Sequence, residues 1–150
     1  MKIMKGFFSV LLSIGLFSFS AGLGDKAPQK VKEAFQKKFP TVSSVEWEKE
    51  SETEWEAEFK IDKIKYSANF SENGTWIETE HEVRKKDIPK NVYNSLMIEF
   101  PGYEIEGVEI SETKDGSFYE FEIERKKITM EVVIGKDAKI IKKTKVDERD

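Results

Sequence analysis

The chain has 150 residues and a formal net charge of −4 at pH 7, with no cysteine and one histidine, His81. Without cysteine the chain forms no disulfide and offers no thiolate to a metal, and a single histidine excludes a cluster of histidine ligands. The negative charge speaks against nucleic-acid binding, which calls for a basic face. Aromatic residues make up 12% of the chain, which favours a folded domain over a disordered one.

Residues 1–20 predict a cleaved secretory signal peptide. Lys2 and Lys5 form a basic start, residues 7–19 form an apolar run, and Ser18 and Ser20 are small residues suited to a cleavage site. The apolar run is shorter than the roughly 20 residues that span a bilayer, which argues against a membrane anchor. We therefore expect a mature chain that begins near Ala21 and is periplasmic or secreted, with no membrane insertion after cleavage.

Two segments of the remaining chain resemble each other. Residues 28–40 read PQKVKEAFQKKFP and residues 89–101 read PKNVYNSLMIEFP, and the similarity continues downstream with a small insertion. A fixed internal period is typical of repeated structural units. The sequence predicts two tandem repeats, over residues 26–83 and 88–146, that form one structural unit joined through residues 84–88.

Within each repeat the hydrophobic period changes from helical to extended. Val31, Phe35 and Phe39 recur at helical spacing after Pro28, and Pro40 ends that helix because the residue before proline avoids the helical region. The following residues alternate between apolar and charged, as half-buried strands do, with tight turns at 73–74 and 115–116. Each repeat is thus predicted to be one helix followed by a four-stranded antiparallel meander.

The predicted fold class is α+β, with both meanders joined into one sheet and the helices on one face. The strands place their large apolar residues on that face. Charged residues occupy the alternate positions and are expected to face water, as on one side of many antiparallel sheets: Glu46, Glu48, Glu56, Glu58, Lys60, Lys65, Glu120, Glu122 and Glu124.

The sequence resembles the PepSY-like, β-lactamase-inhibitor-like family of small exported bacterial proteins. The residues that carry the resemblance lie in segments 31–40, 45–48, 55–59, 66–70 and 73–79, and more weakly in 100–103 and 119–121. The resemblance implies a helix-plus-four-strand repeat, a periplasmic or extracellular location and no catalytic residues. It does not by itself extend β-lactamase inhibition to this chain.

Three site chemistries compete with simple structural roles. His81 lies in a charged stretch and is interpreted as a solvated strand end, because a catalytic base needs a nucleophile and an orienting group nearby. Paired carboxylates suggest glycoside hydrolysis, but their alternate spacing is that of a solvated sheet face. Glu46, Glu48, Glu56 and Glu58 could attract a divalent cation, although no loop carries a calcium motif.

The sequence therefore predicts an exported, non-enzymatic binding module without a cofactor, and the alternative is a small-ligand or divalent-cation-binding envelope protein. The open sheet face and hairpin loops are expected to engage a protein or peptide whose identity stays open, as does the oligomeric state. Phe118 does not occupy one of the alternating strand positions that are predicted to be buried, so it is the best candidate for an exposed aromatic anchor. The predicted partner-binding residues are Glu46, Glu48, Glu56, Glu58, Phe118, Glu120 and Glu122.

Overall fold

The computed structural model describes residues 27–146, in which eight strands form one antiparallel sheet. The strands follow one another across the sheet in chain order, β1 to β8. Helix α1 (Gln29–Lys38) precedes β1, and the short 3₁₀-helix η1 (Lys85–Asp87) and helix α2 (Lys90–Glu99) connect β4 to β5. The strands are β1 (Val45–Ser51), β2 (Glu54–Ile61), β3 (Ile64–Ser71), β4 (Trp76–Glu82), β5 (Glu104–Thr113), β6 (Gly116–Arg125), β7 (Ile128–Gly135) and β8 (Ile140–Val146).

The predicted α+β class, with one antiparallel sheet and two helices, is confirmed. The prolines lie one position before the helices: Pro28 and Pro89 are the N-cap residues of α1 and α2. Both helices end just before a Phe-Pro pair, as predicted. The predicted hairpin turns at 73–74 and 115–116 join β3 to β4 and β5 to β6.

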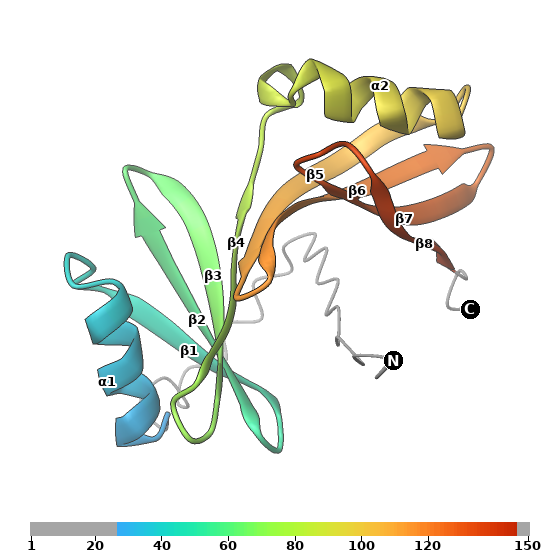
Figure 1. Cartoon of the computed structure of the whole chain (residues 1–150). Coiled ribbons are helices and arrows are strands. Elements are labelled where there is room, and N and C mark those ends of the chain that lie inside the picture. The colour runs from blue at the N-terminus through green and yellow to red at the C-terminus, as the bar shows by residue number, and fades with distance from the viewer. Residues whose placement is uncertain (1–26, 147–150) are drawn as a thin grey trace.

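Both helices lie on the same face of the sheet. One row of cross-strand partners runs from the strands below α1 to those below α2: Phe59, Tyr66, His81, Ile110, Tyr119 and Ile134. Phe59 packs in the α1 cluster and Ile134 in the α2 cluster, so the two helices cover the same side. Figure 1 shows that the sheet bends near β4, with the helices outside the bend and the uncovered face inside it.

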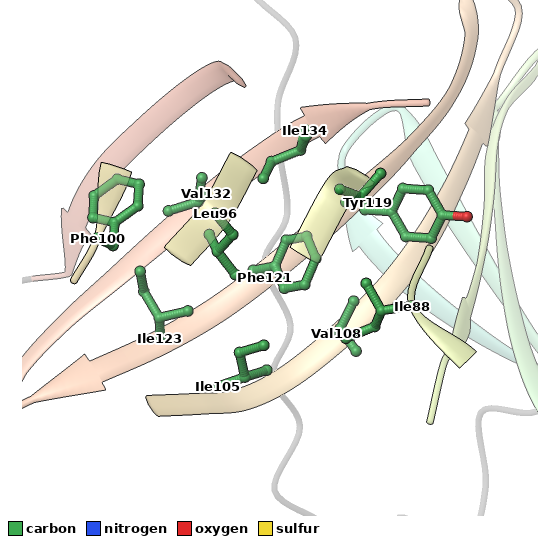
Figure 2. Close-up of a cluster of buried hydrophobic side chains, with 11 residues drawn as sticks. Ile88, Leu96, Phe100, Ile105, Val108, Tyr119, Phe121, Ile123, Val132 and Ile134 are labelled. Atoms are coloured by element: carbon green, nitrogen blue, oxygen red, sulfur yellow. The ribbon is translucent and has the colours of Figure 1, made fainter. Parts of the chain in front are cut away.

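The buried side chains divide into two hydrophobic clusters that share no residue. In the first, Phe35 of α1 packs on aromatic residues of β1 to β3. In the second, Leu96 of α2 packs beside Phe121 of β6 (Figure 2). A helix is about 10 Å wide and strands are about 4.8 Å apart, so each helix covers roughly two or three strands. β4 therefore lies between the two covered regions.

Candidate functional site

The uncovered face of the sheet carries the residues that the sequence analysis selected. We call it the open face and define it by the side chains that alternate with the buried ones on β1 to β8. Its main members are Glu46, Glu48, Glu56, Glu58, Lys65, Ser67, Asn69, Glu78, Glu80, Glu82, Glu109, Ser111, Phe118, Glu120, Glu122, Val133 and Lys142.

The cross-strand register brings the predicted glutamates of the first half together. Glu46 lies opposite Glu58, and Glu48 lies opposite Glu56, on the paired strands β1 and β2. Such like-charged pairs, with Cβ atoms about 5 Å apart, repel each other when both are ionised. This part of the open face therefore concentrates carboxyl groups.

The predicted residues of the second half lie together on β6. Glu120 is opposite Glu109, Phe118 is opposite Ser111, and Glu122 lies one row farther along the strand. The open face is continuous across β4, so these residues and the glutamates of β1 and β2 share one surface. All seven predicted partner-binding residues therefore lie on the same face.

The centre of this surface, formed by β4 and β5, carries acidic residues that are not among the predicted partner-binding residues. Glu78, Glu80 and Glu82 alternate along β4, and Glu109 faces the same side from β5. Their spacing was a usable signal, because carboxylates at every second position of a strand lie on one face. The stretch was instead interpreted only as a charged strand end.

The expectation that these carboxylates face water is wrong for Glu56 and only partly right for Glu120, and the neighbouring β4 carboxylates are also shielded. The residues Glu56 and Glu78 are each only 8% exposed, and Ser111 between the two halves is fully buried. One carboxylate oxygen of Glu120 is buried and lacks a hydrogen-bond partner among the described residues. The inside of a bent sheet brings neighbouring side chains closer together than a flat sheet does, and the open face lies inside the bend shown in Figure 1.

Burial and mutual repulsion change the acidity of the central carboxyl groups. Burial, together with the charges of Glu78, Glu120 and further glutamates, raises the pKa of Glu80 to about 9. Burial, followed by the charges of Glu78 and Glu109, raises the pKa of Glu120 to about 8. Both effects disfavour the charged form. At neutral pH the centre of the open face therefore holds protons that an exposed glutamate would release.

Glu56 forms a second acidic group nearer the first hairpin. Burial raises its pKa to about 8, with further contributions from a hydrogen bond to Glu50 and from the charges of Glu50, Glu58 and Glu48. Burial also raises the pKa of Glu78. The Ser111 hydroxyl donates a hydrogen bond of 3.4 Å to the Glu78 carboxylate, and this bond partly opposes the increase in pKa. The acidic surface thus extends from β1 to β6.

His81 is not the solvated strand end that the sequence predicted. It is half-buried on the helix-covered face, where its ring lies 4.7 Å from the ring of Tyr66. Burial lowers its pKa, which the charge of Glu112 partly opposes. The position has a structural explanation, because β4 lies between the two hydrophobic clusters and His81 fills part of the space between them.

Phe118 lies on the open face, as its off-phase position indicates, but it is half-buried rather than exposed. It stands between Ser111 of β5 and Gly135 of β7, and the nearby Val133 is buried on the same face. This end of the surface is therefore less charged than the part formed by β1 and β2.

Two further observations concern metal ligands and membrane-spanning helices. Within residues 27–146, no group of three or more histidine or carboxylate side chains is arranged to hold a metal ion. No helix in the described part of the chain is long and apolar enough to cross a membrane.

Residues 53–142 match the family described as "Putative beta-lactamase-inhibitor-like, PepSY-like". The match covers more than half of the chain. The chain belongs to this family. The predicted resemblance is thereby confirmed, and it covers strands of both halves of the sheet. No relative among the curated proteins matches the chain.

Solved structures similar to this PepSY-like chain share its fold at low sequence identity. A BLIP-like protein from Bacteroides fragilis has a TM-score of 0.74 and 18% identity, over 87% of this chain and 92% of that one. A DUF2874 family protein from Bacteroides uniformis has a TM-score of 0.72 and 20% identity, over 79% and 89% of the two chains. A protein described as one of the "putative periplasmic proteins" from Bacteroides eggerthii has a TM-score of 0.71 and 14% identity, over 79% and 88%.

Proposed function

We propose that this protein is an exported, non-enzymatic binding module that engages a protein or peptide through its open face. One observation carries the proposal: both helices cover one side of the eight-stranded sheet, and the other side presents a continuous polar surface. Membership of an inhibitor-like family supports it, because such a module acts by occupying a surface rather than by catalysis. The β1–β2 and β5–β6 hairpin loops border the surface and would extend the contact.

The charge of the open face indicates the chemistry of the partner. Its first half carries Glu46, Glu48 and Glu58 with Lys65, whose ammonium lies 3.7 Å from the Glu58 carboxylate. The surplus of carboxylates favours a partner with a basic patch, because complementary charge accelerates encounter. Phe118 would supply an aromatic contact at the less charged end of the surface. In protein interfaces a few such residues carry most of the binding energy.

We infer that the two halves are copies of one unit, and backbone geometry supports this inference. The C-cap residues Phe39 and Phe100 have nearly equal angles, φ −124° and ψ 66° against φ −121° and ψ 65°. The β2–β3 and β6–β7 turns are also alike, since residues 62, 63, 126 and 127 all have positive φ. Sequences that share caps and turns at equivalent positions fold locally in the same way.

Export is part of the proposal. Residues 1–20, on which the signal-peptide prediction depends, lie outside the described residues. The periplasmic description of the similar protein from Bacteroides eggerthii supports the proposal for this chain. N-terminal sequencing of protein from the envelope fraction is expected to find a mature end within two residues of Ala21. Membrane-bound protein that begins at Met1 would contradict export.

The binding proposal is tested by affinity capture from the native envelope fraction, followed by kinetics with the captured partner. We expect the triple variant Glu46→Lys, Glu48→Lys and Glu58→Lys to slow association and alter its salt dependence. Glu56 is left unchanged because a lysine at this buried position would disturb the fold. Phe118→Ala is expected to accelerate dissociation.

Ile98→Ala is the matched control for these variants. Ile98 is 80% exposed on α2, on the covered side of the sheet, so its truncation should leave binding unchanged. Wild-type kinetics for both the lysine variant and Phe118→Ala would exclude the open face as the binding surface. Weaker binding by Ile98→Ala alone would place the partner on the helices instead.

A further inference from the structure

The two halves of the sheet meet at the pairing of β4 with β5, which we call the seam. It consists of five residue pairs, from Glu78 opposite Thr113 to Glu82 opposite Glu109. The amide of Val83 extends it with a 2.9 Å hydrogen bond to the carbonyl of Val108. The two hydrophobic clusters share no residue, and the seam between them is crossed by backbone hydrogen bonds and by the side-chain bond that the Ser111 hydroxyl donates to Glu78.

Carboxylates crowd the open side of this seam. Glu80 lies opposite the fully buried Ser111, with Glu78 two residues before it on the same strand and face. Glu120 comes from β6, opposite Glu109. Ionising several of these groups would place like charges close together in a poorly solvated position, where their repulsion is weakly screened.

The surrounding elements offer few opposing charges. Lys142 of β8 lies opposite Val133 and partly lowers the pKa of Glu120, and Lys65 of β3 pairs with Glu58. The charged and titratable groups around Glu80 and Glu120 are, by element, Glu56, Glu58 and Lys60 of β2, Lys65 of β3, Glu78 and Glu82 of β4, Glu109 of β5, Glu122 of β6, Glu131 of β7 and Lys142 of β8, with His81 and Glu112 on the covered side.

We propose that the seam is a proton-controlled joint: protonated carboxyl groups allow β4 and β5 to pair, and proton loss loosens the pairing and lets the two halves change their relative orientation. The open face spans the seam, so such a change would alter the shape of the whole surface. The joint is a property of the free protein and does not depend on the identity of any partner.

The direction of the pH effect follows from the raised pKa values. The folded chain binds these protons more tightly than the unfolded chain, in which a glutamate has its ordinary pKa of 4.5. The stabilisation is therefore complete below about pH 4.5 and is lost as the pH rises through 8 to 9, where Glu120 and Glu80 titrate. The joint should be closed in acid and loose in alkali.

Hydrogen exchange on the full chain tests the joint, with each amide corrected for its intrinsic rate at pH 6, 7.5 and 9. We expect the protection of β4 and β5 amides at the seam to fall more steeply with pH than that of β2 and β7 amides. If opening of the seam is coupled to the release of one proton, the protection factor should fall roughly tenfold per pH unit. Glutamine mimics the protonated carboxyl, so Glu80→Gln with Glu120→Gln should make the seam protection much less dependent on pH than in the wild type. Glu46→Gln, on an exposed residue of the same face, should keep the wild-type dependence.

A distance measurement makes the test independent of local exchange. The chain has no cysteine, so spin labels can be attached at Lys37→Cys on α1 and Ile98→Cys on α2. We expect the distance distribution to broaden between pH 6 and 9, and to stay narrow in the double glutamine variant. If that variant does not fold, Glu120→Gln alone should reduce the broadening. Seam protection that follows the other strands in the wild type, or an unchanged distance distribution at pH 9, would overturn the proposal.

Discussion

Phe35→Ala is expected to destabilise the first half of the molecule far more than the second. Phe35 is almost fully buried, and its ring lies within 5.1 to 6.2 Å of four other aromatic rings, measured between ring centroids. These large, packed neighbours cannot easily collapse into the space left behind, so we expect a loss of about 4–5 kcal/mol, in the upper part of the range for such truncations. Small domains have roughly 0.05–0.15 kcal/mol of stability per residue, so this loss approaches the whole stability of the first half.

The three tryptophans make the assay selective. Trp47, Trp55 and Trp76 all lie in the first half, so their fluorescence reports on that half, whereas far-UV circular dichroism reports on both. In urea we expect Phe35→Ala to lower the midpoint of the fluorescence transition strongly. Part of the dichroism signal should be lost only at higher urea, where the second cluster unfolds.

Leu96→Ala is the matched variant, since Leu96 is the larger of the two fully buried residues of α2 in the second cluster. Leu96→Ala should lower the urea midpoint of the dichroism transition while changing the fluorescence midpoint much less. Ile98→Ala on the exposed side of α2 should change stability by less than about 0.5 kcal/mol. Superimposed fluorescence and dichroism transitions in both core variants would show one cooperative unit and refute the two-cluster reasoning. A cost of Phe35→Ala below about 1 kcal/mol would refute the packing estimate.

Gly74→Ala should cost more than Gly102→Ala, because a methyl group at Gly74 would lie 2.7 Å from the carbonyl oxygen of Lys30 in addition to the strain of its φ of +87°. We expect well over about 1 kcal/mol at Gly74 and about 1 kcal/mol at Gly102, measured by thermal unfolding, and equal costs would contradict the close contact. Lys63→Gly and Lys127→Gly should each stabilise the protein by several tenths to about 1 kcal/mol, because both lysines have positive φ in tight hairpin turns. Opposite effects at these two positions would argue against equivalent turns in the two halves.

Local structure could be predicted from the sequence because it depends on neighbouring residues. The Phe-Pro pairs at 39–40 and 100–101 end both helices, and the turn residues at 73–74 and 115–116 define two hairpins. Alternation also placed Trp47, Phe59 and Phe121 on the buried side and Glu46 and Glu120 on the other. These patterns are sufficient because periods of 3.6 and 2 residues assign side chains to faces directly.

The open face could be predicted in part. Its outline follows from alternation, which selected the glutamates of β1 and β2 and Phe118 of β6. Its centre was missed, although Glu78 and Glu80 follow the same period, and only the pairing of β4 with β5 shows that these residues lie beside those of the second half. A pairing between strands separated by a helix is a long-range contact, and the position of β4 between the two helices determines it.

Burial and acidity were decided by the tertiary structure alone. The sequence by itself assigns Glu56 to a polar face and predicts that it is solvated, and it gives no sign that Glu78 and Glu80 are buried. Burial raises the pKa of all three, with further contributions from glutamates of β1 and β2 at Glu56, from Glu54 at Glu78, and from glutamates that include Glu109 of β5 and Glu120 of β6 at Glu80. The bend of the sheet separates the aromatic cluster under α1 from the cluster under α2. Alternation along a strand determines which side a residue faces, but only the curvature of the whole sheet determines how much water remains there.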